Sequence, residues 1–276
     1  MLLKTNYTVI ETKKLRYFEL GDKKNSVFIL LHGYPDNLQI WHKIAPLLAK
    51  HYYVVGFDWP GMGDSEAWAG GATPVIMANR LKKIADHFQL KKINILAQDM
   101  GGQAGLVFAS LYPIYTQSVF VMNSLLMWNE KTSWEITLLR KFRFNEFVLN
   151  YLPHLVFRIA TRTFVEHGRS AINEELKNDL WLNFKKKEVR KYIVRMCAGY
   201  GAQLKKLPAY YQNIKCPVTL IWAEKGKHFS INHAYAFKEM CPQTEIVAIK
   251  DAQHWMVLNR QEEIADIVFS KAAQLS

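Results

Sequence analysis

Asp99 stands at the apex of a predicted strand-to-helix turn, where a carboxylate can act as a nucleophile. The apolar run Ile93–Ala97 predicts a buried strand, and residues 101–111 predict a helix. Ala97 and Gly101 flank Asp99 at two residues on either side. A sharp turn needs such small neighbours, because a larger side chain would collide with the crossing backbone. The alternative is that Asp99 only caps the following helix, since Asp is a good N-cap.

Two other loops carry the groups that an aspartate nucleophile needs. The sequence His-Gly-Tyr-Pro at 32–35 follows an earlier predicted strand. There the backbone N–H of Tyr34 could join that of Met100 in an oxyanion hole. His254 follows the last predicted strand and could reach the turn as a general base. Taken together, these features favour a nucleophile over a helix cap.

The choice of aspartate restricts the substrate. Attack by a carboxylate on an acyl carbon would give a high-energy anhydride, whereas attack on an sp³ carbon with a leaving group gives an ordinary ester. Asp99 therefore suits epoxides or alkyl halides. His254 would then activate water against the ester, and the oxyanion hole would stabilise the tetrahedral intermediate. A serine esterase is disfavoured, because no serine stands at the apex.

These motifs resemble the α/β-hydrolase superfamily over nearly the whole chain, and most of all its Asp-nucleophile branch, the epoxide hydrolases and haloalkane dehalogenases. The matching pieces are HGYP at 32–35, DWPGMGDS at 58–65, AQDMGG at 97–102, IWAEKG at 221–226 and DAQHW at 251–255. The resemblance implies a doubly wound, mostly parallel sheet with an inserted helical cap, a small-molecule substrate and no cofactor. The loop at 58–65 is interpreted as structural.

The resemblance also implies a triad acid for His254 at one of two strand ends, but those positions hold Gly226 and Asn123. Glu224 lies two residues from the first position and could serve if the turn is rearranged. A solvated turn charge is an equal alternative for Glu224. Asn123 could hydrogen-bond the imidazole without supplying charge. Loss of the acid lowers a triad's rate by on the order of 10⁴-fold without abolishing it.

The hydrogen-bond donors near the nucleophile indicate which leaving group the site could hold. The dehalogenases resembled here hold the halide with an indole N–H after the nucleophile, where this chain has Met100, and part of that family has an Asn donor where Tyr34 stands. Trp128 or Trp134 could contribute an N–H, with packing inside the cap as the alternative.

Epoxide hydrolases instead use phenol donors from the cap. Tyr192 and Tyr200 lie closest to the expected spacing, although most tyrosines of the insertion are expected to pack. The stretches 98–102 and 122–124 look more like dehalogenases. On balance the sequence slightly favours epoxide opening, with a haloalkane dehalogenase as the alternative. A catalytically impaired fold that binds a small ligand is the second alternative.

Strand and helix patterns alternate along the chain except in one stretch, 124–214, which is helical by pattern. The alternation predicts βαβ units and a parallel sheet. We therefore expect a core formed by 1–123 and 215–276 and a helical cap at 124–214, over the carboxyl ends of the strands. The expected elements are a hairpin at 7–20, strands at 27–31, 52–57, 93–97, 118–122, 217–222 and 245–249, and helices at 37–50, 75–88, 101–111, 231–240 and after 260.

Composition excludes a mainly disordered chain, because 50% of the 276 residues are apolar and 22% are charged. The net charge of +12 invites a nucleic-acid or anionic-membrane interpretation. However, 124–214 holds 16 Lys and Arg against 8 Asp and Glu, so +8 of the excess lies in the predicted cap. No nucleic-acid module is visible, so we expect neither nucleic acid nor membrane as a partner. The charge could favour an anionic substrate.

The three cysteines have no paired or metal-binding spacing, which indicates a reducing cytoplasm and no metal site. The first residues lack the apolar core of a secretory signal, and no apolar run is long enough to span a membrane. No pattern indicates an oligomeric state.

Overall fold

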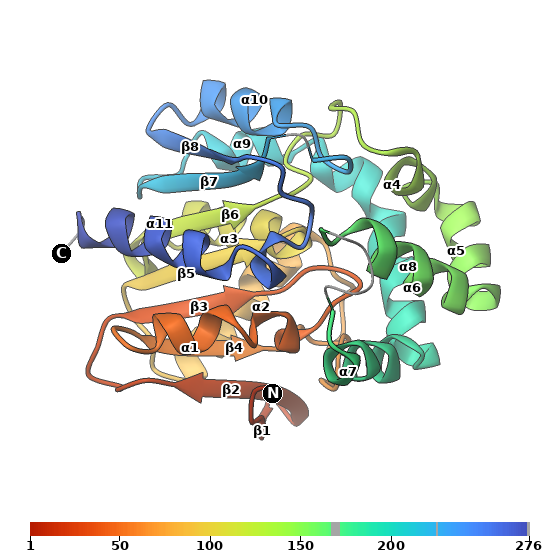
Figure 1. Cartoon of the computed structure of the whole chain (residues 1–276), viewed down its shortest axis with the longest axis horizontal. Coiled ribbons are helices and arrows are strands. Elements are labelled where there is room, and N and C mark those ends of the chain that lie inside the picture. The colour runs from red at the N-terminus through yellow and green to blue at the C-terminus, as the bar shows by residue number, and fades with distance from the viewer. Residues whose placement is uncertain (167–171, 225, 275–276) are drawn as a thin grey trace.

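A computed structural model describes residues 1–166, 172–224 and 226–274, apart from the side chains of 142 and 200 (Figure 1). Its centre is an eight-stranded sheet in the order β1-β2-β4-β3-β5-β6-β7-β8. Pairing is antiparallel between β1 and β2 and between β2 and β4, and parallel between all other neighbours. The strands are β1 (Asn6–Ile10), β2 (Lys13–Leu20), β3 (Val27–Leu31), β4 (Tyr53–Phe57), β5 (Ile93–Gln98), β6 (Thr116–Met122), β7 (Val218–Ala223) and β8 (Thr244–Ile249).

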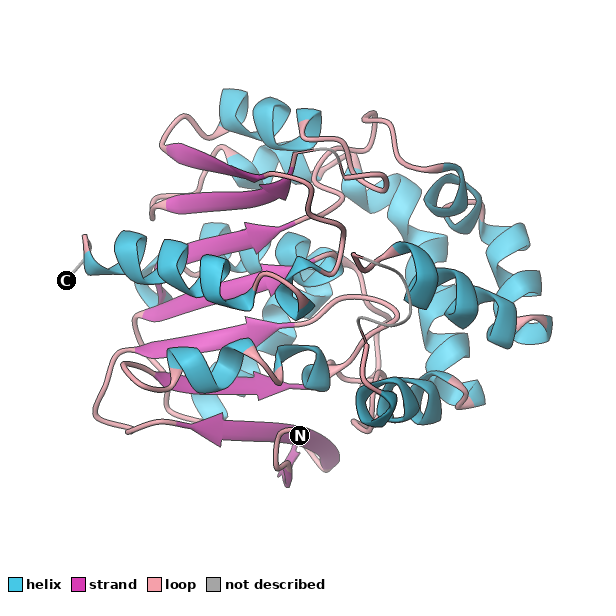
Figure 2. Ribbon diagram, viewed as in Figure 1, coloured by secondary structure: helices cyan, strands magenta, loops and turns pink. Residues whose placement is uncertain are grey.

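The central strands form the core because helices cover both faces of the sheet (Figure 2). Every residue of β3, β4, β5 and β7 is buried, as expected of parallel strands covered on both sides. Helices α1 (Ile44–Leu48) and α11 (Gln261–Ala273) pack together on one face. Helices α2 (Pro74–His87), α3 (Met100–Leu111), α9 (Leu207–Tyr211) and α10 (Asn232–Met240) form the other layer. The predicted doubly wound, mostly parallel sheet is confirmed.

Five helices between β6 and β7 lie beyond the carboxyl ends of the parallel strands, at the right of Figure 1. We call α4–α8 the helical segment. Helix α9, although it precedes β7, packs against α3 in the core. The treatment of 124–214 as a separate cap domain stays a prediction. The five helices are α4 (Trp134–Leu139), α5 (Phe142–Tyr151), α6 (Pro153–Thr163), α7 (Glu174–Phe184) and α8 (Lys187–Leu204).

The element predictions agree with the structure except at 37–50, where one helix was expected. A 3₁₀ turn, η1 (Leu38–Trp41), is capped by Asn37, whose side chain accepts the N–H of Gln39 at 2.9 Å. Helix α1 then begins anew at Ile44. Pro46 has no N–H to donate to the carbonyl of residue 42, so a continuous helix would lose a hydrogen bond at this point.

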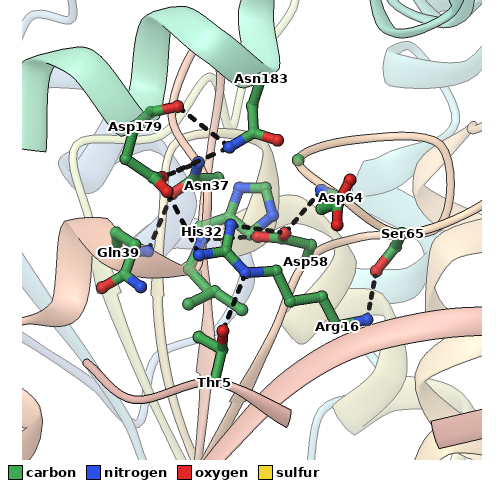
Figure 3. Close-up of polar contacts among 12 residues, drawn as sticks. Thr5, Arg16, His32, Asn37, Gln39, Asp58, Asp64, Ser65, Asp179 and Asn183 are labelled. Atoms are coloured by element: carbon green, nitrogen blue, oxygen red, sulfur yellow. Dashed lines mark hydrogen bonds and ion pairs between the residues drawn. The ribbon is translucent and has the colours of Figure 1, made fainter. Parts of the chain in front are cut away.

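A buried polar network holds α7 against the core (Figure 3). The guanidinium of Arg16, on β2, lies 3.6 Å from a carboxylate oxygen of Asp58 and 3.3 Å from one of Asp179, on α7. Asn37 donates to the other oxygen of Asp179 at 2.8 Å. Burial alone would lower the pKa of Arg16, but Asp58 and Asp179 raise it overall. These contacts fix one end of the helical segment over the strand ends.

The carboxylate of Asp58 also accepts the backbone N–H groups of Leu38 and Asp64, each at 2.8 Å. This agrees with the structural role predicted for the loop at 58–65. None of the helices formed by the described residues is both long and apolar enough to cross a bilayer.

Candidate active site

Asp99 occupies a strained turn between β5 and α3. Its φ of 50° and ψ of −127° lie in a region that residues with a side chain rarely adopt. The backbone passes so closely that a Cβ on Gly33 would lie 2.4 Å from the Cβ of Asp99. A Cβ on Gly101 would lie 2.4 Å from the carbonyl oxygen of Leu31. The turn therefore depends on glycine at both positions, and it projects Asp99 from the strand end.

Two backbone N–H groups converge on one carboxylate oxygen of Asp99. Oδ1 accepts the N–H of Met100 at 2.6 Å and that of Tyr34 at 3.3 Å. These are the two groups that the sequence predicts for an oxyanion hole, and the oxygen they bind belongs to Asp99 itself. The other oxygen, Oδ2, is left free of these donors.

His254 lies on the opposite side of Asp99. Its Nε2 is 3.4 Å from Oδ2, within ion-pair distance, but the alignment is too poor for a hydrogen bond. The ring is buried between the aromatic rings of Phe164, at 4.7 Å between centroids, and Phe229, at 5.2 Å. The loop after β8 thus delivers the imidazole to the carboxylate, as its place in the sequence predicts.

No acid supports this histidine among the residues that the structure describes. Nδ1 of His254 has no hydrogen-bond partner there. Glu224 is exposed, and its backbone N–H bonds to the carbonyl of Ile249. The structure does not bring its carboxylate to the imidazole, because the turn after β7 points that side chain to solvent.

Asn123 contacts the backbone of the histidine loop rather than the imidazole. Its Nδ2 donates to the carbonyls of Gln253 at 3.2 Å and His254 at 3.1 Å, and its Oδ1 accepts the N–H of Ala223 at 3.0 Å. The side chain therefore ties the ends of β6 and β7 to the loop that carries His254. Asn123 therefore positions the loop. Both of its polar side-chain atoms are bonded to the backbone, so neither is free to hydrogen-bond the imidazole of His254.

A second histidine, His228, lies with its ring centroid 6.0 Å from that of His254. Burial, with a smaller effect of His254, lowers the pKa of His228 to about 4. Its Nε2 is 3.2 Å from the carbonyl of Thr163 and its Nδ1 is 3.0 Å from the hydroxyl of Ser133. These partners suit a neutral ring that donates through Nε2, so His228 supplies no charge to the site.

Two cavities share lining residues near the active site, and Asp99 lines the inner one. The inner cavity, of about 60 Å³, is lined by Asp99, Cys197, Arg140 and mainly apolar side chains. The outer cavity, of about 240 Å³, lies among α4, α5 and α6 and is almost wholly apolar. Tyr34, Ile136 and Leu139 line both. Larger hollows at the outer side of α6 and α7, near β2 and around Arg260 include neither Asp99 nor His254.

The aromatic donors proposed from the sequence do not line the inner cavity. Trp128 packs under the guanidinium of Arg140, which lies 4.0 Å from the ring centroid. Trp134 is 66% exposed and lines the outer cavity. Tyr192 packs against Gly61, and its hydroxyl is bound by Arg80. The side chain of Tyr200 lies outside the described residues.

Three groups in the inner cavity were not predicted: the phenol of Tyr34, the thiol of Cys197 and the guanidinium of Arg140. Burial, with a smaller effect of Asp99, raises the pKa of Cys197 to about 12, so the thiol stays protonated and unreactive. Burial lowers the pKa of Arg140, whose guanidinium donates to the carbonyl of Trp128 at 2.6 Å. Tyr34 was visible in the motif at 32–35, whereas nothing in the sequence sets Cys197 or Arg140 apart.

Comparisons with known proteins bear on the fold of the chain. A family model described as alpha/beta hydrolase fold matches residues 26–261. A soluble epoxide hydrolase from Corynebacterium sp. (strain C12) is 21% identical over 268 residues, with 90% of each chain covered.

Two solved structures show how widely the fold is shared. The haloalkane dehalogenase DbeA from Bradyrhizobium elkani USDA94 is similar with a TM-score of 0.84 and 19% identity, covering 99% of this chain and 98% of that one. An esterase from Thermogutta terrifontis is similar with a TM-score of 0.81 and 18% identity, covering 99% of both chains. Likeness at this identity establishes the fold alone, so the reaction has to be argued from the site.

Proposed function

Because the chain belongs to the alpha/beta hydrolase fold family and is a hydrolase of that type, we propose that it opens an sp³ C–O bond of a small apolar epoxide through an ester on Asp99. The observation that carries the proposal is the binding of Oδ1 of Asp99 by the N–H groups of Tyr34 and Met100. An acyl substrate would have to displace Oδ1 to place its own oxyanion there. A substrate attacked by Oδ2 leaves those hydrogen bonds intact.

The first step would be an in-line attack of Oδ2 on carbon. The C–O bond of the epoxide breaks, its electron pair stays on the epoxide oxygen, and that oxygen takes up a proton. Asp99 now carries an ester whose carbonyl oxygen is Oδ1, already held by the two N–H groups. The oxyanion hole thus engages the intermediate without any movement of Asp99.

The second step would be hydrolysis of the ester. His254 takes a proton from water while the water oxygen attacks the carboxyl carbon of Asp99, and negative charge develops on Oδ1. The tetrahedral intermediate then breaks down, and the departing alkoxide takes the proton from His254 to become the alcohol. One oxygen of Asp99 is exchanged for water oxygen in each turnover, and the net reaction adds one water to the epoxide.

An epoxide is favoured over a halide by the donors in the inner cavity. No indole lines this cavity among the described residues, whereas a phenol and a guanidinium do. A developing alkoxide needs a proton and gains most from such donors. The alternative is a haloalkane dehalogenase with an altered halide site, and the similar fold of a haloalkane dehalogenase supports testing it. The second alternative, a ligand-binding protein of impaired activity, is favoured by the unpartnered Nδ1 of His254.

The cavities also favour a substrate with a short reactive end and an apolar chain. A water-sized group occupies about 30 Å³, so the inner cavity has room for about two such groups and the outer for about eight. Arg140 is the cation of the helical segment that lines the inner cavity, and it would have to carry any preference for an anionic substrate. The three free thiols suit a reducing compartment, and the proposed location is the cytoplasm.

The proposal is tested by intact-mass spectrometry with panels of 1,2-epoxyalkanes and 1-haloalkanes. Wild type should turn over one panel, and His254→Gln should retain a substrate-sized adduct that maps to Asp99. Asp99→Ala should show neither turnover nor adduct. Ligand-induced stabilisation of wild type without turnover or adduct on either panel would instead favour the binding protein.

A further inference from the structure

Tyr34 brings two polar groups to the site, and only one of them has a partner. Its backbone N–H binds Oδ1 of Asp99 at 3.3 Å. Its hydroxyl is buried and has no hydrogen-bond partner among the described residues. A buried hydroxyl without a partner is unfavourable, so native structures keep few of them. The arrangement is explained if the partner arrives with the substrate.

The position of this phenol fits such a partner. Tyr34 lines the inner cavity with Asp99 and also the outer cavity, so its side chain lies where the two meet. Burial, with smaller effects of Cys197 and Asp99, raises the pKa of Tyr34 well above its ordinary value. The hydroxyl therefore keeps its proton at neutral pH. A proton donor in the same cavity as the carboxylate is what the opening of an epoxide by Oδ2 calls for.

Three other tyrosines of the segment between β6 and β7 have hydroxyls that are already bonded or lie at the surface. The hydroxyl of Tyr192 is bound by Arg80, and that of Tyr211 donates to the carbonyl of Leu126 at 3.2 Å. Tyr151 is 73% exposed. Among the described residues, no tyrosine other than Tyr34 lines the inner or the outer cavity.

We propose that the phenol of Tyr34 is a catalytic residue: it hydrogen-bonds the epoxide oxygen and gives it its proton as Oδ2 of Asp99 attacks the carbon. The C–O bond of the epoxide breaks as the Oδ2–C bond forms, and the proton moves from the phenol to the oxygen. The resulting tyrosinate recovers a proton when hydrolysis regenerates Asp99, since water supplies one proton to the alcohol through His254 and the other to the phenol. This role rests on the proposed function.

The test measures ester formation alone, in the His254→Gln background where the adduct persists. Tyr34→Phe removes the hydroxyl and keeps the backbone N–H that binds Asp99. Loss of a general acid lowers a rate by about 10²–10⁴-fold, so the adduct from 1,2-epoxyhexane should form at least about 100-fold more slowly. Tyr211→Phe removes a buried phenol of the core and should leave this rate within about twofold.

A second substrate separates proton donation from structure. A bromide ion leaves without a proton, so any adduct from 1-bromohexane should form at a rate that Tyr34→Phe changes far less than the rate with the epoxide. An equal loss on both substrates would mean that the phenol only shapes the site and would overturn the proposal, as would an unchanged epoxide rate. If the His254→Gln parent forms no adduct with either substrate, the proposed function itself fails.

Discussion

Oδ2 of Asp99 lies 3.4 Å from Nε2 of His254, while Nδ1 of the same imidazole has no partner among the described residues. The first step does not involve His254, because in that step the carboxylate of Asp99 attacks the substrate. The second step needs a histidine whose tautomer is fixed and whose positive form is stabilised. Asn123 binds the backbone carbonyls of the loop that carries His254. It neither fixes the tautomer of the imidazole nor stabilises its positive form.

We therefore expect hydrolysis of the ester to limit turnover, so that wild type accumulates the alkylated form. During turnover, epoxide should be consumed in a fast burst of one equivalent per enzyme. Rapid quenching after this burst, followed by intact-mass measurement, should find most of the enzyme carrying the adduct. The burst amplitude serves as the control for the active fraction. A steady state with mostly unmodified enzyme would show that an acid, or another group, supports His254 after all.

Because the backbone of Asp99 is strained, we expect that replacing this residue with glycine stabilises the fold and abolishes activity. Asp99→Gly should abolish the adduct, and it should raise the free energy of unfolding by about 1 kcal/mol, because glycine adopts positive φ freely. Asp99→Asn keeps the strain and is the matched variant, with stability near that of wild type. Urea unfolding measures both. A glycine variant less stable than wild type would show that the hydrogen bonds of Oδ1 outweigh the strain.

The outer cavity predicts a limit to chain length. Along a series of 1,2-epoxyalkanes, kcat/KM should rise by up to about fourfold per methylene, which corresponds to about 0.8 kcal/mol, and level off once about eight atoms fill the cavity. Val156→Phe narrows this cavity and should move the limit to shorter chains. Leu182→Phe, on the exposed side of α7, should leave the limit unchanged. A series without any chain-length dependence would contradict the assignment of the cavity.

His228 predicts loss of stability in acid. Its pKa is about 4 in the folded chain and ordinarily 6.5. Between these values the unfolded chain binds a proton that the folded chain does not, so the free energy of unfolding falls as the pH drops from about 6.5 to 4. The contribution is about 3 kcal/mol at most. Urea unfolding across this range should show a weaker pH dependence for His228→Gln. An unchanged slope would mean that His228 is protonated without cost in the fold.

The fold could be predicted from the sequence because its signals are local. The apolar runs of the strands, such as Val27–Leu31, coincide with the strands of the structure, and the small residues around Asp99 mark the turn. The single helix expected at 37–50 was wrong: the chain forms a 3₁₀ turn at Leu38–Trp41 and a separate helix from Ile44, and Pro46 has no N–H with which to continue the first turn into the second.

The candidate site was predictable only where position along the chain determines position in space. Asp99, His254 and the N–H groups of Tyr34 and Met100 lie at strand ends and meet there. Partners that depend on packing of the helical segment were not predictable. Tyr192 has the spacing of a donor and is bound by Arg80 instead, whereas Cys197 and Arg140 reach the cavity without any sequence signal.

The ester on Asp99 is the central claim, and its most direct test is a single turnover of an epoxide in H₂¹⁸O with enzyme in excess. Mass spectrometry then follows both the product and the peptide that contains Asp99. The ester route predicts that the new hydroxyl of the product carries unlabelled oxygen and that Asp99 gains one ¹⁸O. Label in the product, with none in Asp99, would mean that water attacks the substrate directly and would contradict the account.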